Sequence, residues 1–150
     1  MFEWLTLSRL EREVLRAIKS DGWTTVPIEG PDITWHYSVG LLDHGLPELI
    51  TFVYPGDFAA KLIYQAQLRV RDGRFKPADG LHWTDPDSDW ECRWRRVHHS
   101  QHHFNWFLMA KWYHHRRTGR REHFDVYQLV HPDAEHRYPW EEGFDEALRQ

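Results

Sequence analysis

The chain has 150 residues, of which 41% are hydrophobic and 15% are aromatic, with nine tryptophans among them. This length and apolar content suit one folded domain over residues 1–150 and exclude a disordered chain, because so much apolar surface is more stable when buried. The net charge of −4 is unevenly spread: residues 93–123 hold eight lysines and arginines against one acid, Glu122, whereas the rest holds 11 basic and 22 acidic residues.

The chain shows no sign of export or of a membrane span. Its longest apolar run, residues 104–113, is interrupted by Asn105 and Lys111 and is too short to cross a bilayer. The N-terminus lacks the cationic flank and apolar stretch of a secretory signal. The lone cysteine, Cys92, excludes an intramolecular disulfide. We therefore expect a cytoplasmic protein.

The first predicted element is a helix that begins after Ser8 and runs to about Ser20. Glu11 stands three residues after Ser8, as a capping box requires, and Asp21 and Gly22 are typical of a helix end. Apolar residues recur every three to four positions, at Leu10, Val14, Leu15 and Ile18.

Three strands are predicted next, over residues 23–28, 34–41 and 48–54. The turn composition of residues 29–32 makes the first two an antiparallel pair. Pro27 has no N–H for a ladder hydrogen bond, which places the first strand at an edge or gives it a bulge. The continuous apolar run of the third strand predicts a central position, buried on both faces.

A second helix is predicted from an N-cap at Asp57 to about Val70, ended by Asp72 and Gly73, and residues 74–89 are predicted to be a loop. Alternation of apolar and polar residues then predicts a fourth strand through Trp90, Cys92 and Trp94.

A third helix over residues 102–117 and a fifth strand over residues 124–130 complete the predicted elements. Because the first three strands have short connections, we expect an α+β fold. It would be a single domain with a mainly antiparallel sheet of about five strands and about three helices packed on it.

Several separated motifs resemble, in order, those of a bacterial and phage family catalogued as domain of unknown function 4262. They are Tyr37-Ser38-Val39-Gly40-Leu41, Pro47-Glu48-Leu49, Gln128-Leu129-Val130 with Pro132-Asp133, and Tyr138-Pro139-Trp140-Glu141. The resemblance runs from about residue 22 to residue 144, after the N-terminal helix. Two positions depart from it: Leu46 where a histidine often precedes Pro-Glu-Leu, and His131 where a tryptophan often precedes Pro-Asp. The resemblance implies a fold group and no particular activity.

The twelve histidines include two pairs spaced four residues apart, His98 with His102 and His99 with His103. On a helix each pair would share a face, and two such imidazoles could chelate a divalent metal such as zinc or nickel. We take His99 and His103 as candidate ligands, and otherwise expect no cofactor. His114 lies about 16 Å further along a helix, so a third ligand has to come through the fold. Solvated histidines at a helix start explain the run equally well.

A catalytic hypothesis concerns Tyr37, His44 and Glu48, which put a hydroxyl, a base and an acid near strand ends and could support hydrolysis or proton transfer. We favour the alternative, in which Gly40 and Pro47 shape a turn and Glu48 pairs locally. No nucleophile elbow supports the catalytic interpretation.

A binding hypothesis concerns the basic segment, whose arginines are interleaved with tryptophan and tyrosine. These candidate binding residues are Arg93, Arg95, Arg96, Arg116, Arg117, Arg120 and Arg121. Such a composition suits a nucleic acid or nucleotide, but the acidic remainder would repel a long polyanion, so an acidic protein surface is the favoured partner. The arginines could also pair with the acids of the chain itself.

These observations rank a protein-interaction module with a basic, aromatic-rich surface first. The alternative is a small metal-dependent or acid/base hydrolase, so whether the protein is an enzyme stays open. Nucleic-acid binding ranks third and would weaken steeply with added salt.

Overall fold

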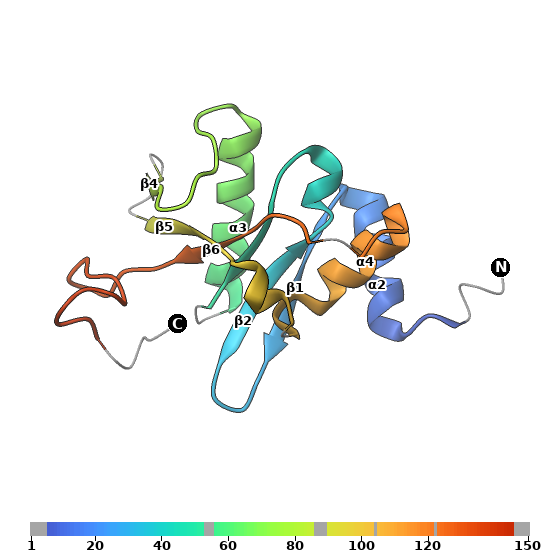
Figure 1. Ribbon diagram of the computed structural model, residues 1–150, viewed down its shortest axis with the longest axis horizontal. Coiled ribbons are helices and arrows are strands. Elements are labelled where there is room, and N and C mark those ends of the chain that lie inside the picture. Colours follow the sequence, from blue (N-terminus) through green and yellow to red (C-terminus); the bar gives the residue numbers. More distant parts are fainter. Residues whose placement is uncertain (1–5, 53–55, 86–89, 104, 122, 146–150) are drawn as a thin grey trace.

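The computed structural model describes residues 6–52, 56–85, 90–103, 105–121 and 123–145. In this part of the chain a six-stranded mixed sheet has the spatial order β1-β2-β3-β6-β5-β4 (Figure 1). The strands are β1 (Thr24–Glu29), β2 (Thr34–Val39), β3 (Glu48–Thr51), β4 (His82–Thr84), β5 (Glu91–Arg96) and β6 (Val126–Val130). The α-helices are α2 (Arg9–Asp21), α3 (Gly56–Arg71) and α4 (Leu108–Thr118), and the 3-10 helices are η1 (Leu41–His44), η2 (His99–His103) and η3 (Asn105–Phe107). The expected α+β single domain is confirmed, with one strand more than expected.

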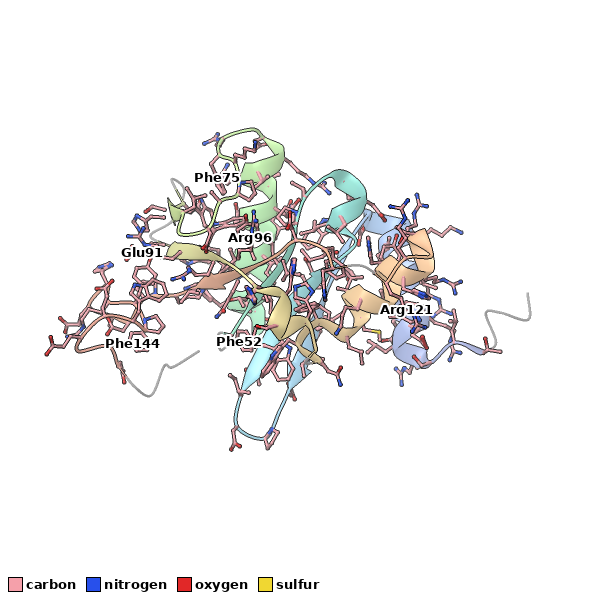
Figure 2. All side chains as sticks on the ribbon, viewed as in Figure 1. Phe52, Phe75, Glu91, Arg96, Arg121 and Phe144 are labelled. Carbon is pink, nitrogen blue, oxygen red and sulfur yellow. The ribbon has the colours of Figure 1, made fainter. Side chains whose placement is uncertain are left out.

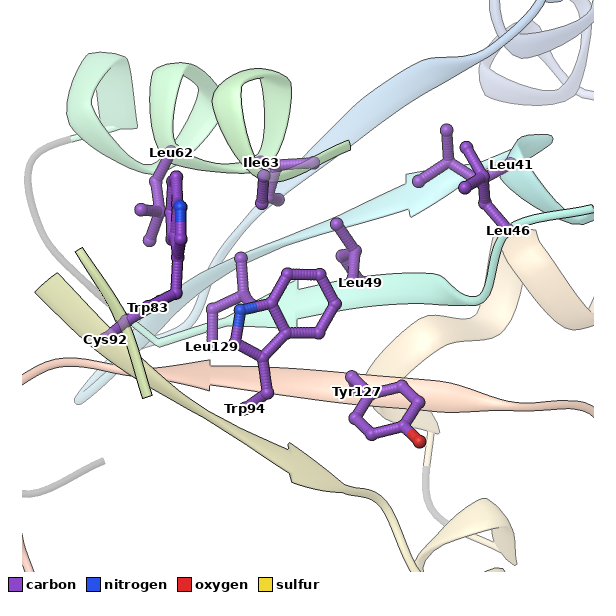
Figure 3. Packing of buried hydrophobic residues seen from close by; sticks show 11 residues of the cluster. Leu41, Leu46, Leu49, Leu62, Ile63, Trp83, Cys92, Trp94, Tyr127 and Leu129 are labelled. Atoms are coloured by element: carbon purple, nitrogen blue, oxygen red, sulfur yellow. The ribbon is translucent and has the colours of Figure 1, made fainter. Parts of the chain in front are cut away.

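The sheet has two covered faces, and β3 lies between them. Leu49 packs on the side of α3, in a core with Leu62, Ile63, Trp94, Tyr127 and Leu129 (Figure 3). The next residue, Ile50, packs on the side of α2 and α4, in a core with Val14, Tyr37, Phe107, Ala110 and Val126. All four residues of β3 are buried. The prediction of a central strand buried on both faces is confirmed.

The beginning and end of α2 are as predicted. The Ser8 side chain accepts a hydrogen bond from the Glu11 N–H, and the Glu11 carboxylate accepts one from the Ser8 N–H. Gly22 ends the helix with a φ of 88°, a left-handed conformation that favours glycine. Val14 is buried against the sheet.

The edge position of the first strand is also confirmed. β1 is the outermost strand and pairs antiparallel with β2, with Pro27 opposite His36. A proline on an edge strand removes no hydrogen bond from the interior of the sheet.

Two expected elements are wrong in part. The predicted loop over residues 74–89 contains β4, which pairs with β5 but has three residues, too few to show alternation. The predicted helix over residues 102–117 starts late, because η2 and η3 precede α4 and the α-helix begins at Leu108.

The predicted strands also end differently from their observed counterparts. β2 ends at Val39, because Gly40 has a φ of 100° and η1 follows it. β6 begins at Val126 instead of residue 124. The end of the third predicted strand, residues 53 and 54, lies outside the described residues.

One strand pair departs from the antiparallel pattern. β3 and β6 pair in parallel, with Glu48 opposite Val126, and α3, β4, β5 and α4 lie between them in the chain. This pair joins the β1–β2–β3 half of the sheet to the β6–β5–β4 half. Within the described ranges, none of the helices is both long and apolar enough to span a membrane.

Candidate functional site

Glu48 is a buried carboxylate that connects β2, η1 and β3. It accepts hydrogen bonds from the Ser38 hydroxyl at 2.8 Å and from the backbone N–H groups of Gly40 and Leu41 at 3.0 Å each. Burial raises its pKa to about 7, and these hydrogen bonds lower it by less. Every one of these contacts lies within residues 38–48, so Glu48 has a clear role in holding this turn.

The other two candidate catalytic groups have separate partners. The buried Tyr37 hydroxyl accepts a hydrogen bond from the Met109 N–H, which positions the first turn of α4 against β2. The exposed His44 ring lies 2.9 Å from the Gly22 carbonyl oxygen, at the end of α2. The structure therefore gives Tyr37, His44 and Glu48 three different sets of hydrogen bonds.

The seven candidate arginines form two groups, because β5 and α4 lie towards opposite sides of the molecule (Figure 1). Arg96 and Arg121 mark these two groups in Figure 2. The arginines of β5 contact nearby parts of the same chain. Arg93 lies over the Tyr138 ring at 5.6 Å, Arg95 over Trp140 at 5.2 Å, and Arg96 donates to the Tyr127 hydroxyl at 2.8 Å.

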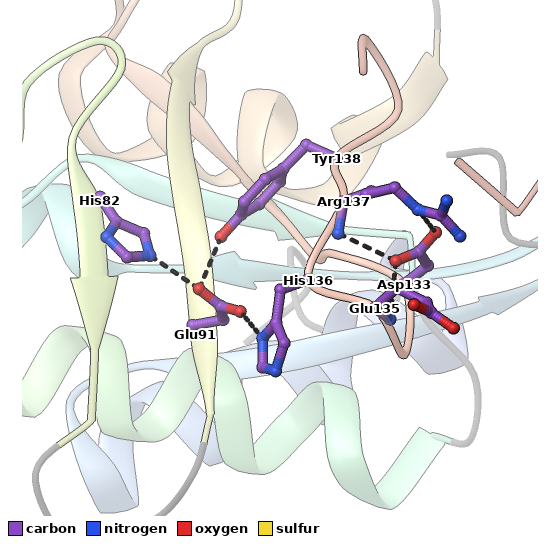
Figure 4. Close-up of polar contacts among 7 residues, drawn as sticks. All are labelled: His82, Glu91, Asp133, Glu135, His136, Arg137 and Tyr138. Atoms are coloured by element: carbon purple, nitrogen blue, oxygen red, sulfur yellow. Dashed lines mark hydrogen bonds and ion pairs between the residues drawn. The ribbon is translucent and has the colours of Figure 1, made fainter. Parts of the chain in front are cut away.

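The C-terminal segment, which we define as residues 131–145, is held against β4 and β5 by Glu91 (Figure 4). The Glu91 carboxylate lies 2.8 Å from His82 Nε2, accepts a hydrogen bond from the Tyr138 hydroxyl at 3.5 Å, and contacts His136 Nδ1. Asp133 accepts hydrogen bonds from the N–H groups of other residues in the segment, Glu135, Arg137 and Asp145. The Glu91 carboxylate of β5 thus connects the segment to the sheet through His136 and Tyr138.

The pKa shifts of Glu91 and His136 have the directions expected of an ion pair. Burial alone would raise the pKa of Glu91, but the hydrogen bonds from His136 and His82 outweigh it and lower the pKa. The hydrogen bond to Glu91 raises the pKa of His136 above its ordinary value of 6.5. Because the His136 pKa is higher in the folded state, this contact stabilises the folded state fully at pH values below the unfolded pKa. The contribution is lost as the pH rises through the folded pKa.

We expect the C-terminal segment to loosen in mildly alkaline solution, because His136 then loses its proton. Hydrogen exchange of residues 131–145, corrected for the intrinsic rate, should show less protection at pH 8.5 than at pH 6. The His136→Ala variant should be poorly protected at both pH values, and the control His98→Ala should match the unmodified protein. Equal protection of the segment at both pH values would contradict the ion-pair role.

The histidine pairs were expected on an α-helix, but residues 99–103 form the 3-10 helix η2, in which positions four apart do not align. The rings of His99, His102 and His123 instead pack together, with centroids 4.8 to 5.6 Å apart. The side chain of His103 lies outside the described part of the protein. Within the described ranges, no group of three or more His, Cys, Asp or Glu side chains could hold a metal ion.

His102 is the most buried member of this cluster, with 4% of its surface exposed. Burial, together with electrostatic repulsion from His123, His99 and Lys111, lowers its pKa to about 4. Its Nε2 atom makes no hydrogen bond to any described residue. His102 is therefore a buried imidazole surrounded by other basic side chains.

This environment belongs to a pocket of about 480 Å³, which we call the basic pocket. Its walls come from η2, from α4 and from the residues after α4. The lining side chains are His102, Leu108, Lys111, Trp112, His114, His115, Arg120, Arg121, His123 and Phe124. None of these described side chains is acidic. Another hollow of about 600 Å³, between β1 and α3, has both Asp21 and Lys61 in its lining and therefore no single sign of charge.

Two of the seven candidate arginines, Arg120 and Arg121, line the basic pocket. Arg121 Nε donates to His115 Nε2 at 3.2 Å. Arg116 instead lies over the Trp112 ring, 5.8 Å from its centroid, and Arg117 lies 3.9 Å from the Asp43 carboxylate.

Sequence reasoning missed the contributions of Lys111 and of the histidines at positions 114, 115 and 123 to this site. The signal that could have indicated them was the basic bias of residues 93–123. The sequence could not show that η2 and the residues after α4 lie close together, because they are separated along the chain.

The chain is an α+β protein with a mixed six-stranded sheet and a pocket lined by basic side chains. The chain belongs to the family described as domain of unknown function, DUF4262, whose model matches residues 17–145. The match agrees with the motifs between Tyr37 and Glu141 and reaches back into α2. Neither the curated proteins nor the solved structures yielded a match.

Proposed function

We propose that the protein is an interaction module that binds an acidic segment of a partner protein in the basic pocket. The observation that carries this proposal is the lining of the pocket, where Lys111, Arg120 and Arg121 meet four imidazoles. Crowded positive charges repel one another, and an anionic ligand removes that repulsion.

The aromatic and apolar part of the wall supports a protein ligand. Trp112 and Phe124 line the pocket beside Leu108, which has 47% of its surface exposed. Aromatic side chains next to arginine are typical of the residues that contribute most to protein interfaces. The acidic remainder of the chain disfavours a long nucleic acid by repulsion.

The hydrolase alternative has less support, since Tyr37, His44 and Glu48 have separate hydrogen-bond partners. As part of the proposal we place the interaction in the cytoplasm of a bacterial or phage-infected cell. The lone cysteine and the family resemblance support that location.

Fluorescence anisotropy with a labelled peptide rich in glutamate and alanine tests the proposal. We expect the Arg120→Gln/Arg121→Gln variant to bind about tenfold more weakly than the unmodified protein, because two charged hydrogen-bond donors are lost. The matched control Arg93→Gln/Arg95→Gln, on β5, loses the same charge and should bind normally.

The proposal would be wrong if the unmodified protein ignored the peptide, or if both variants bound equally weakly. A single-stranded oligonucleotide provides a second comparison. Tighter binding to the oligonucleotide with a steep salt dependence would favour nucleic-acid recognition instead.

A further inference from the structure

We infer that the group recognised in the basic pocket is a phosphate monoester. This inference rests on the proposed function and specifies its ligand. A phosphate monoester carries a charge of about −1.5 to −2 near pH 7 and has three strong acceptor oxygens. Two sources present this group: a phosphorylated side chain and a mononucleotide.

The number and type of the cationic donors favour phosphate over a single carboxylate. Lys111, Arg120 and Arg121 are permanent cations in the lining. A phosphate dianion carries about twice the charge of a carboxylate and has three acceptor oxygens, so it can contact several of these donors at once. Lysine and arginine are also the side chains that most often bind phosphate, as a point charge and as a two-pronged donor.

The donors come from two parts of the chain, which surrounds a ligand better than one helix face could. Lys111 lies within α4, and its ammonium group donates to the His102 carbonyl of η2. Arg120 and Arg121 follow the end of α4 at Gly119, where a φ of 73° turns the chain back. This turn brings Arg121 Nε to His115 Nε2 and places the guanidinium group in the pocket wall.

The histidines add a second indication that the pocket holds a ligand. His102 and His114 both line the pocket, and the Nε2 atom of each is buried without a hydrogen bond to a described residue. Buried polar atoms normally have partners, and an exception is most often explained by an absent ion, water or ligand.

The size of the pocket allows more than the phosphate. A volume of about 480 Å³ is within the range of small-ligand sites. Trp112, Leu108 and Phe124 supply an apolar wall for the carbon atoms attached to the phosphate. The ligand is therefore a phosphate ester and not free inorganic phosphate.

Isothermal titration calorimetry with three ligands tests this inference. The ligands are a short peptide with one phosphoserine, the same peptide with glutamate at that position, and adenosine 5′-monophosphate. We expect at least one phosphate ester to bind about tenfold more tightly than the glutamate peptide. The tighter of the two esters identifies the source of the phosphate.

Two variants locate the binding. Arg120→Gln/Arg121→Gln should lose about tenfold or more in affinity for the phosphate ester. The control Arg93→Gln/Arg95→Gln removes the same charge from β5, whose arginines do not line the pocket, and it should lose less than threefold. Circular dichroism of both variants checks that they are folded.

The outcomes separate the inference from the function on which it rests. If the glutamate peptide bound as tightly as both esters, the phosphate inference would be overturned and the acidic-partner proposal would stand. If all three ligands failed to bind the folded protein, both would fail. Equal losses in the two double variants would also overturn the inference, because a diffuse positive field would then explain the binding.

Discussion

Replacing Glu48 by alanine is expected to lower the free energy of unfolding by about 3 kcal/mol. The Ser38 hydroxyl and the N–H groups of Gly40 and Leu41 all donate to this carboxylate. Alanine leaves these donors buried without an acceptor, and each unsatisfied donor costs about 1 to 3 kcal/mol. Urea unfolding followed by far-UV circular dichroism measures the effect.

The Glu48→Gln variant measures how much the ionisation of Glu48 contributes to the pH dependence of stability. Burial raises the Glu48 pKa from 4.5 to about 7 in the folded protein. The folded state therefore binds more protons than the unfolded state between these pH values, and stability falls as the pH rises through this window. Glutamine has the same shape and does not titrate, so the variant should lose this part of the pH dependence. An unchanged slope of stability between pH 4.5 and 7 would show that Glu48 does not titrate there.

Replacing Trp94 by alanine is expected to cost about 4 kcal/mol. Trp94 has none of its surface exposed, and its ring lies edge to face against that of Tyr127, at a centroid distance of 5.8 Å (Figure 3). The Phe75 ring also meets Trp94 edge to face, at 5.3 Å. Alanine leaves a cavity between α3 and the sheet. Domains of this size have a total stability of about 5 to 15 kcal/mol, so this variant should lose a large fraction of it, which urea unfolding measures.

Trp94→Phe should be much milder, at about 1 to 2 kcal/mol, although it also removes volume. The Trp94 indole N–H is buried without a hydrogen-bond partner among the described residues, and phenylalanine removes this unfavourable group. Trp140→Phe is the matched control and should change stability by less than about 0.5 kcal/mol, because Trp140 is 50% exposed. If Trp94→Phe destabilised as much as alanine, the indole N–H would have a partner such as a bound water.

The predictions that were confirmed depend on neighbouring residues. The capping box of Ser8 and Glu11 and the left-handed Gly22 bound α2. Pro27 correctly indicated an edge strand. The errors occurred where local signals were short or ambiguous, as in β4 with three residues, and in the start of α4, where two 3-10 helices replace the expected α-helical turns.

The candidate site was less predictable than the fold. The basic bias of residues 93–123 is visible in the sequence, but it does not show that Arg93 and Arg95 stack on Tyr138 and Trp140. Nor does it show which of the other basic side chains share a pocket. Those contacts depend on how α4 and the C-terminal segment pack on the sheet.

Local sequence was sufficient for the ends of α2, the burial of β3, the α+β class and the family, because each depends on residue preferences over a few positions or on ordered motifs. Tertiary packing alone decided the parallel pairing of β3 with β6, the division of the arginines and the basic pocket. The physical reason is distance along the chain: contacts between remote residues depend on the burial and hydrogen bonding of the whole sheet, which no short segment encodes.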